Sequence, residues 1–255
     1  MDHPASSPAR VAAPASVSPG FTAELEAACA GLETYGPGAD RARLLPIEEA
    51  VRQSGNNPAA LAPLARRLAA LLARPLPLPA VDFICDLLGK IGGHDEVPAL
   101  ASALNQTDRC EAARAALERI PGEPAARALR RALTQLTGNA RIGVMLSIGR
   151  RHDRRSVPAL GRLLTGPNRA TAEAAAAALG EIGDERAARL LSKLPAAARQ
   201  SWGTAYADAV LRCAERLAES GHAADAARLV APLTAADQPR HVRAAATRWP
   251  GVTSK

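Results

Sequence analysis

The sequence predicts an all-α protein, built as a right-handed α-α superhelix in which antiparallel helix pairs stack into a solenoid. Aromatic residues make up only 2% of the chain, so Ala, Leu, Val and Ile must form a core of closely packed helices. No stretch alternates β-branched and polar residues as a half-buried strand would. A pattern with a period of about 30 residues recurs along the middle of the chain, which is typical of stacked repeats.

The first two segments precede the repeats. Residues 1–21 are rich in Pro, Ser and Ala and are expected to form a disordered tail, without the continuous apolar stretch of a secretory signal. Residues 22–76 are expected to fold as an N-terminal helical cap, because a solenoid must cover its first apolar face. The strongly amphipathic stretch 58–74 is its clearest helix.

Residues 77–196 are expected to hold four repeats, each a pair of helices. The first helix ends in an L-G-x-I-G element, whose glycines allow close packing and then a left-handed stop. The second helix begins with a proline in its first turn, where no N–H is needed. Apolar residues follow at helical spacing around one anchor leucine per repeat. These prolines and leucines are Pro98, Pro124, Pro158, Leu100, Leu129, Leu160 and Leu190.

Residues 197–249 are expected to form a helical hairpin followed by one last helix, and residues 250–255 a short tail. The last helix has no following partner. It either folds back as a cap or leaves an apolar face, including Trp249, for another chain.

The V-P-A-L helix starts at 97–100 and 157–160, and the A-L-G-E-I-G helix end at 178–183, resemble the short bacterial HEAT repeats of phycobilisome-lyase-like proteins. The resemblance covers about half of the chain. It implies the superhelix described above and an activity among those of scaffolds, adaptors and a few enzymes.

The link between the two helices of the third repeat is the most basic loop in the chain. Its arginines, Arg150, Arg151, Arg154 and Arg155, are interpreted first as a solvated turn and second as a contact for an anion or a partner. Asp153 and Asp184 stand just before second helices, where an Asp caps the helix, so we expect them to close turns.

The exposed side of the second helices is the expected partner-binding face. Arg131 and Arg162 occupy equivalent positions two residues after their anchor leucines, and stacking brings such positions about 10 Å apart. An acidic or helical protein segment is the expected partner. The candidate residues of this face are Arg127, Arg131, Arg162, Arg189 and Lys193.

Two alternatives to a non-enzymatic protein-binding scaffold stay open. The net charge of +7 permits nucleic-acid binding through Arg131, Arg162 and the basic loop, although aromatic residues for base stacking are missing from the basic repeats. A HEAT-like enzyme, a lyase or a metal-dependent oxidoreductase, is the third possibility. It lacks support because His94-Asp95 and His152-Asp153 fall at different registers, so we expect no metal and no cofactor.

The four cysteines contain no C-x-x-C pair, which fits buried thiols in a reducing, cytoplasmic compartment. No apolar run reaches the roughly 18 residues of a membrane span, so no membrane association is expected. The identity of the partner and the oligomeric state stay open.

Overall fold

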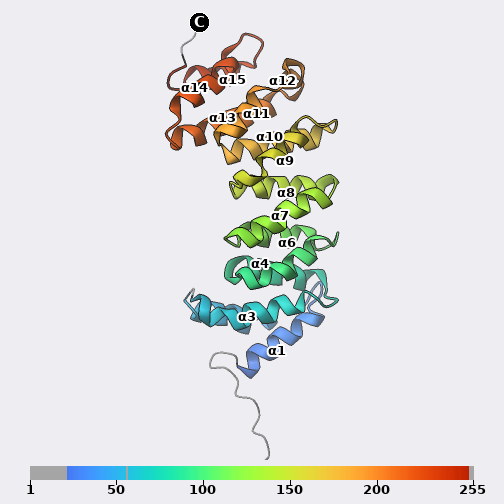
Figure 1. The fold of residues 1–255 in the computed structure, drawn as a ribbon. Helices are drawn as coiled ribbons and strands as arrows, with labels where there is room; N and C mark the ends of the chain where they lie inside the picture. The colour runs from blue at the N-terminus through green and yellow to red at the C-terminus, as the bar shows by residue number, and fades with distance from the viewer. Residues whose placement is uncertain (1–21, 56, 253–255) are drawn as a thin grey trace, which may run out of the picture.

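The computed structural model describes residues 22–55 and 57–252, which form a tall, curved stack of helices (Figure 1). The tail expected over 1–21 lies outside the described residues, as do residues 253–255 of the second tail. Within the described ranges, fifteen α-helices and no strand are present. The predicted fold class, an all-α solenoid, is therefore confirmed.

Three α-helices and two short 3-10 turns begin the stack. They are α1 (Ala23–Gly31), the turns Leu32–Thr34 and Arg41–Leu44, α2 (Leu45–Gln53) and α3 (Pro58–Leu71). Side chains cap two of these helices, since Thr22 accepts a hydrogen bond from the N–H of Leu25 and Asn57 accepts one from Ala59. Helix α3 then packs on the first helix pair.

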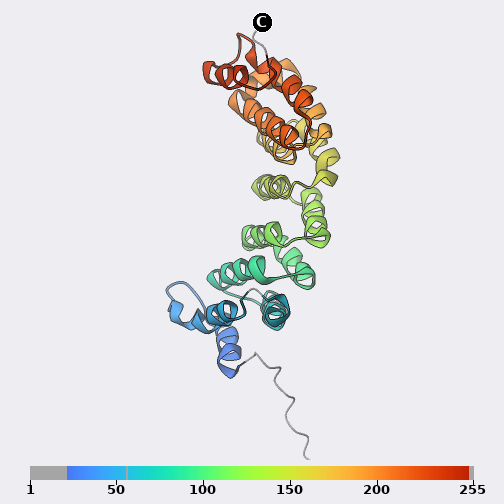
Figure 2. The same ribbon diagram turned by 90° about the vertical axis from the view of Figure 1, so that its left-hand side faces the viewer.

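Eight helices form the four middle pairs. The first helices of the pairs are α4 (Leu78–Ile91), α6 (Cys110–Arg119), α8 (Gly138–Arg150) and α10 (Arg169–Ile182). The second helices are α5 (Val97–Leu104), α7 (Glu123–Gln135), α9 (Val157–Leu164) and α11 (Glu185–Ser192). Each first helix packs on the next one, and Figure 2 shows the two helices of each pair falling into two columns along a bent stack.

The apolar stripes face the space between the columns. Leu100, Leu129 and Leu160 are completely buried, as the repeat pattern predicts. Leu190 is only partly buried, although it packs against the core, while Leu191 beside it is completely buried. Leu190 instead covers Gly161 of the neighbouring second helix, where its Cδ1 lies 2.9 Å from the place that a Cβ would take.

The predicted helix ends are correct in part. Pro98, Pro124 and Pro158 stand in the first turns of α5, α7 and α9. Gly183 ends α10 in the left-handed conformation, with φ of 61°. Gly92 ends α4 in extended backbone instead, because the chain leaves that helix directly into the next turn.

The L-G glycines hold neighbouring first helices at close range. A Cβ on Gly149 would lie 2.9 Å from the Cα of Ala178, and a Cβ on Gly180 would lie 2.7 Å from the carbonyl oxygen of Ala209. Both neighbours are backbone atoms, which cannot turn aside as a side chain can. Glycine at these two positions is therefore a condition of the spacing between the helices.

Four more helices complete the chain: α12 (Ala196–Trp202), α13 (Thr204–Glu219), α14 (Ala223–Val230) and α15 (Arg240–Thr247). Helix α12 was not expected from the sequence. Helix α15 packs on the turn Ala231–Thr234 and on α13, and it buries Val242 and Ala246. Trp249 is half-buried against the core, so the last helix folds back onto the stack. None of the described helices has the length and apolar character that crossing a membrane requires.

Gly180→Ala tests the close approach of α10 and α13. The new methyl group would meet the backbone of Ala209, so we expect the free energy of unfolding to fall by about 1–3 kcal/mol. Chemical denaturation followed by circular dichroism measures the change. The matched control is Gly161→Ala, whose methyl meets only the movable end of Leu190 and which gains about 1 kcal/mol of helix propensity. Equal midpoints for the two variants would contradict the proposed role of Gly180.

Candidate partner-binding face

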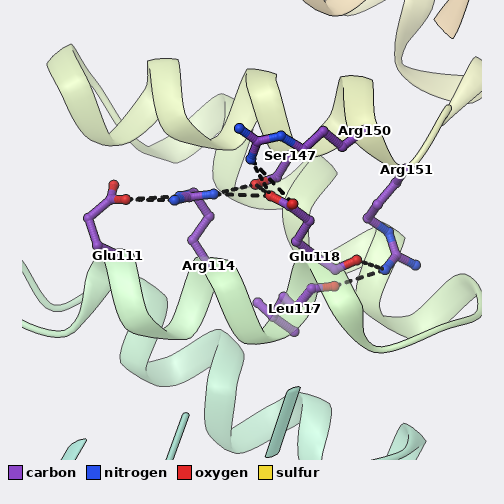
Figure 3. Close-up of polar contacts among 7 residues, drawn as sticks. All are labelled: Glu111, Arg114, Leu117, Glu118, Ser147, Arg150 and Arg151. Atoms are coloured by element: carbon purple, nitrogen blue, oxygen red, sulfur yellow. Dashed lines mark hydrogen bonds and ion pairs between the residues drawn. The ribbon is translucent and has the colours of Figure 1, made fainter. Parts of the chain in front are cut away.

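Arg151, in the basic loop, reaches back to the preceding repeat. Its guanidinium Nη1 donates hydrogen bonds of 2.9 Å to the carbonyl oxygens of Leu117 and Glu118 (Figure 3). Its Nη2 donates one of 2.9 Å to the carbonyl oxygen of Gly122. Burial lowers the pKa of this half-buried arginine. Arg151 thus satisfies carbonyls at the end of α6 that have no partner within their own helix.

Arg150 belongs to a partly buried polar contact between α6 and α8 (Figure 3). Its Nη1 lies 2.9 Å from Oε2 of Glu118, which also accepts a hydrogen bond of 2.7 Å from the hydroxyl of Ser147. Arg114 donates to the same hydroxyl at 2.7 Å. Glu118 stands where the first, third and fourth repeats carry a glycine, so this contact takes the place of the close backbone approach that Gly149 and Gly180 make.

The environment of Glu118 favours its charged form. Burial by itself would raise the pKa of this carboxyl, but the hydrogen bonds from Ser147 and Arg150 and the positive charges of Arg150 and Arg114 hold it below its ordinary value. Ser147 is completely buried, so its hydroxyl needs these partners.

The other residues of these links either contact the rest of the fold or extend into solvent. Arg155 lies 2.7 Å from Oε1 of Glu123, while Arg154 is exposed and has no ion pair within the described part of the chain. Asp184 caps α11 by accepting from the N–H of Ala187 at 2.8 Å, as predicted. The prediction is wrong for Asp153, whose side chain accepts no backbone N–H. Its Oδ2 instead accepts hydrogen bonds from Arg130 at 2.8 Å and from the hydroxyl of Ser156 at 2.7 Å.

The two columns of helices differ in charge. The first helices, counting α13 with them, carry nine acidic and eight basic side chains, whereas the second helices, counting α14, carry three acidic and seven basic ones. Some of the charged side chains of the first helices form ion pairs with a neighbouring first helix. These ion pairs are Asp86–Arg119 at 2.9 Å, Glu118–Arg150 at 2.9 Å, Glu181–Arg212 at 3.3 Å and Glu181–Arg216 at 3.8 Å. The excess of positive charge therefore lies on the second helices.

We call the outward surface of α5, α7, α9, α11 and α14 the second-helix face. Each of the five predicted partner-binding residues is exposed there or, for Lys193, directly after α11. Arg127 and Arg189 lie 4.0 and 3.6 Å from glutamates one turn earlier in their own helices. Arg131, Arg162 and Lys193 make no ion pair with any residue that the structure describes.

Two grooves cross this face, and the sequence pattern did not predict them. One, of about 440 Å³, lies between α5 and α7 and has Arg127 and Arg131 in its wall. The other, of about 370 Å³, lies between α11 and α14 and includes Arg189 and Arg228. The predicted residues are thus distributed over separate grooves, with Arg162 and Lys193 outside both.

A smaller hollow of about 230 Å³ joins the basic loop to the same face, since Arg154 lines it together with Arg186 and Arg189. The sequence contains one sign of this hollow. Arg186 and Arg189 follow the link of the fourth repeat, which is equivalent to the basic loop that carries Arg154 in the third repeat.

Groups for covalent or metal chemistry are unfavourably placed among the described residues. The four cysteines are buried and free, and burial raises the pKa of Cys85 and of Cys213 to about 12, far from thiolate chemistry at neutral pH. One group could offer three metal ligands within 4.8 Å of one another: Glu185, His222 and Asp225. Arg189 and Arg228 already pair with its two carboxylates, so the group forms an ion-pair network.

Glu118→Gln tests the polar contact between α6 and α8. The variant leaves Ser147 and Arg150 without a charged acceptor, so we expect a loss of about 1–3 kcal/mol in the free energy of unfolding at pH 7. The pKa of Glu118 is lowered in the folded state from an ordinary value of 4.5, so its contribution is complete above that value and disappears as the pH falls through the folded-state pKa. Denaturation midpoints measured across acidic pH should therefore converge for the two proteins.

The control for this experiment is Glu173→Gln, which removes a surface ion pair with Arg169 inside a single helix. We expect it to change the unfolding free energy by less than about 0.5 kcal/mol. A pH-independent difference between Glu118→Gln and the wild type would rule out the charge of Glu118 as the cause.

Comparison with known proteins gives a family match for the middle of the chain. A search of curated proteins found no match. Among solved structures, the chain is similar to an engineered protein at 19% identity, covering 75% of this chain and 89% of that chain with a TM-score of 0.42. Residues 126–207, from within α7 into α13, match the family of HEAT repeats, which supports a HEAT-repeat protein.

Proposed function

We propose that this protein is a non-enzymatic interaction scaffold whose second-helix face binds an acidic segment of a partner protein. The observation that carries the proposal is the excess of arginine on this face, including Arg131 and Arg162, which have no ion pair among the described residues. Helical-repeat solenoids generally use such extended surfaces to bind other proteins. An acidic partner would gain charge-assisted hydrogen bonds from Arg131 and Arg162 without breaking existing ion pairs.

A protein partner fits this face better than a nucleic acid does. Three of the four loop arginines, Arg150, Arg151 and Arg155, are already engaged with the preceding repeat, which leaves Arg154 of that loop for a phosphate. Aromatic side chains of the described residues lie elsewhere, as Tyr35 and Phe83 do in a groove between α2 and α4. Stacking of bases on this face would therefore lack a platform.

The proposal also places the protein in the cytoplasm and assigns it no cofactor. The four buried thiols, which are unpaired in the fold, support a reducing compartment. We expect an assay of this protein to detect binding of the partner and not turnover of a substrate.

Affinity capture from the native host tests the proposed face. The double variant Arg131→Glu, Arg162→Glu should recover the partner about tenfold less well than the wild type, because two attractive charges become repulsive. The matched control is Arg240→Glu, Arg248→Glu, which makes the same change in net charge at two exposed positions of α15 and just after it. We expect this control to recover the partner as the wild type does.

Two results would overturn the proposal. One is equal recovery of the partner by Arg131→Glu, Arg162→Glu and by the wild type. The other is retention of the wild type on DNA with an affinity that falls steeply between about 50 and 200 mM salt, which would replace the proposal by nucleic-acid binding.

A further inference from the structure

We infer that the groove between α5 and α7 holds a short acidic, amphipathic helix of the partner, about two turns long. The inference rests on the proposed function and adds the place and the chemistry of the contact. Below, this site is called the α5–α7 groove.

Small side chains and a short helix create the α5–α7 groove. Helix α5 has only 8 residues, whereas α7 beside it has 13. The residues lining the groove include Ala101 and Ser102 from α5 and Ala128 and Ala132 from α7, none of which extends far enough to fill the space between the helix axes. The result is a groove of about 440 Å³ between the two helices.

The lining of the α5–α7 groove is apolar below and basic at one edge. Val97, Leu104 and Ala132 line it and are themselves buried. Arg127 and Arg131 are exposed and project from the α7 side. No acidic residue is among those that line the groove. Arg131 makes no ion pair with any described residue, and the nearest carboxylate to Arg127 is that of Glu123, 4.0 Å away and outside the lining.

The spacing of the arginines indicates the shape of the ligand. Arg127 and Arg131 lie four residues apart on α7, which places their Cβ atoms about 5–6 Å from each other. Two carboxylates one turn apart on a helix have the same spacing. A helix lying along α7 would face both arginines with these carboxylates and turn its apolar side chains into the groove.

The length of the groove agrees with about two helical turns. Its residues on α7 run from Pro124 to Gln135, a rise of about 17 Å along the helix, and those on α5 run from Val97 to Asn105. The shorter α5 limits the segment that contacts both walls to about two turns.

The other grooves lack this combination of features. In the groove between α11 and α14, Arg189 and Arg228 pair with Glu185 and Asp225, which line the same groove. In the groove between α2 and α4, Glu48, Asp82 and Asp86 line the walls beside Arg41 and Lys90. Acidic ligands would meet repulsion from carboxylates in both places, so the α5–α7 groove is the one that fits.

The test uses a defined probe, a fluorescent 12-residue peptide with a helix-stabilising link, apolar residues on one face and two glutamates one turn apart. Its binding to the full chain is measured by fluorescence anisotropy. The comparison peptide has the same composition and link, but its order is shuffled so that the apolar face is lost. We expect the shuffled peptide to bind at least about tenfold more weakly, because charge alone does not fill the groove.

Ala128→Leu is the decisive variant, because it fills the α5–α7 groove without changing the charge of the face. We expect it to weaken binding of the amphipathic peptide by about tenfold or more. Its matched control is Ala188→Leu, the same substitution of a half-buried alanine in the groove between α11 and α14, which should bind the peptide as the wild type does. If Ala128→Leu fails to fold, the double variant Arg127→Gln, Arg131→Gln takes its place. We expect it to weaken binding of the amphipathic peptide, because it removes both positive charges without altering the packing.

Equal affinity of the wild type for the two peptides, or wild-type affinity in Ala128→Leu, would overturn the groove assignment. The native partner separates this outcome from failure of the proposed function. If Arg131→Glu, Arg162→Glu loses the partner while Ala128→Leu retains it, the face is correct and the groove is wrong. If both variants retain it, the proposed function fails as well.

Discussion

The close approach of consecutive first helices is the constraint on which the rest of the structure depends. Gly149 and Gly180 let the backbone of one first helix touch that of the next, and alanines at 178 and 209 keep the opposite side equally flat. A chain with so few aromatic residues obtains its packing from short distances between backbones rather than from large side chains. The second helices then fall at a spacing that these contacts determine.

The charge is distributed along the same division between the two columns. Neighbouring first helices are close enough for their acidic and basic side chains to meet across the interface, as Asp86 and Arg119 do. The second helices are mostly shorter and present small residues to one another, so their arginines extend into solvent and grooves remain between them. Internal cohesion and an available basic face thus arise from the same difference between the two columns.

The sequence predicted the parts of this architecture that depend on local patterns. Prolines in the first turns of α5, α7 and α9, the left-handed Gly183 and the buried stripes all follow from rules that act within one helix or one turn. The exposure of the candidate arginines follows from the same periodicity. Leu190 and Leu191 both fit an apolar stripe, and the pattern within one helix does not show that Leu190 lies over Gly161 of the neighbouring helix while Leu191 is buried. The grooves and the bonding of Arg151 depend on atoms from two repeats, including backbone carbonyls, which no residue pattern encodes.

The reach of Arg151 into the carbonyls of α6 makes adjacent repeats depend on each other in a particular order. Arg109, just before α6, does the same for the end of α3 by donating to the carbonyl oxygens of Leu72 and Arg74. A helix pair without the pair that follows it would expose carbonyl oxygens that accept no hydrogen bond. A helix pair without the pair that precedes it would carry an arginine whose guanidinium has no acceptor. These hairpins are consequently poor interchangeable modules, and their order along the chain is part of what stabilises them.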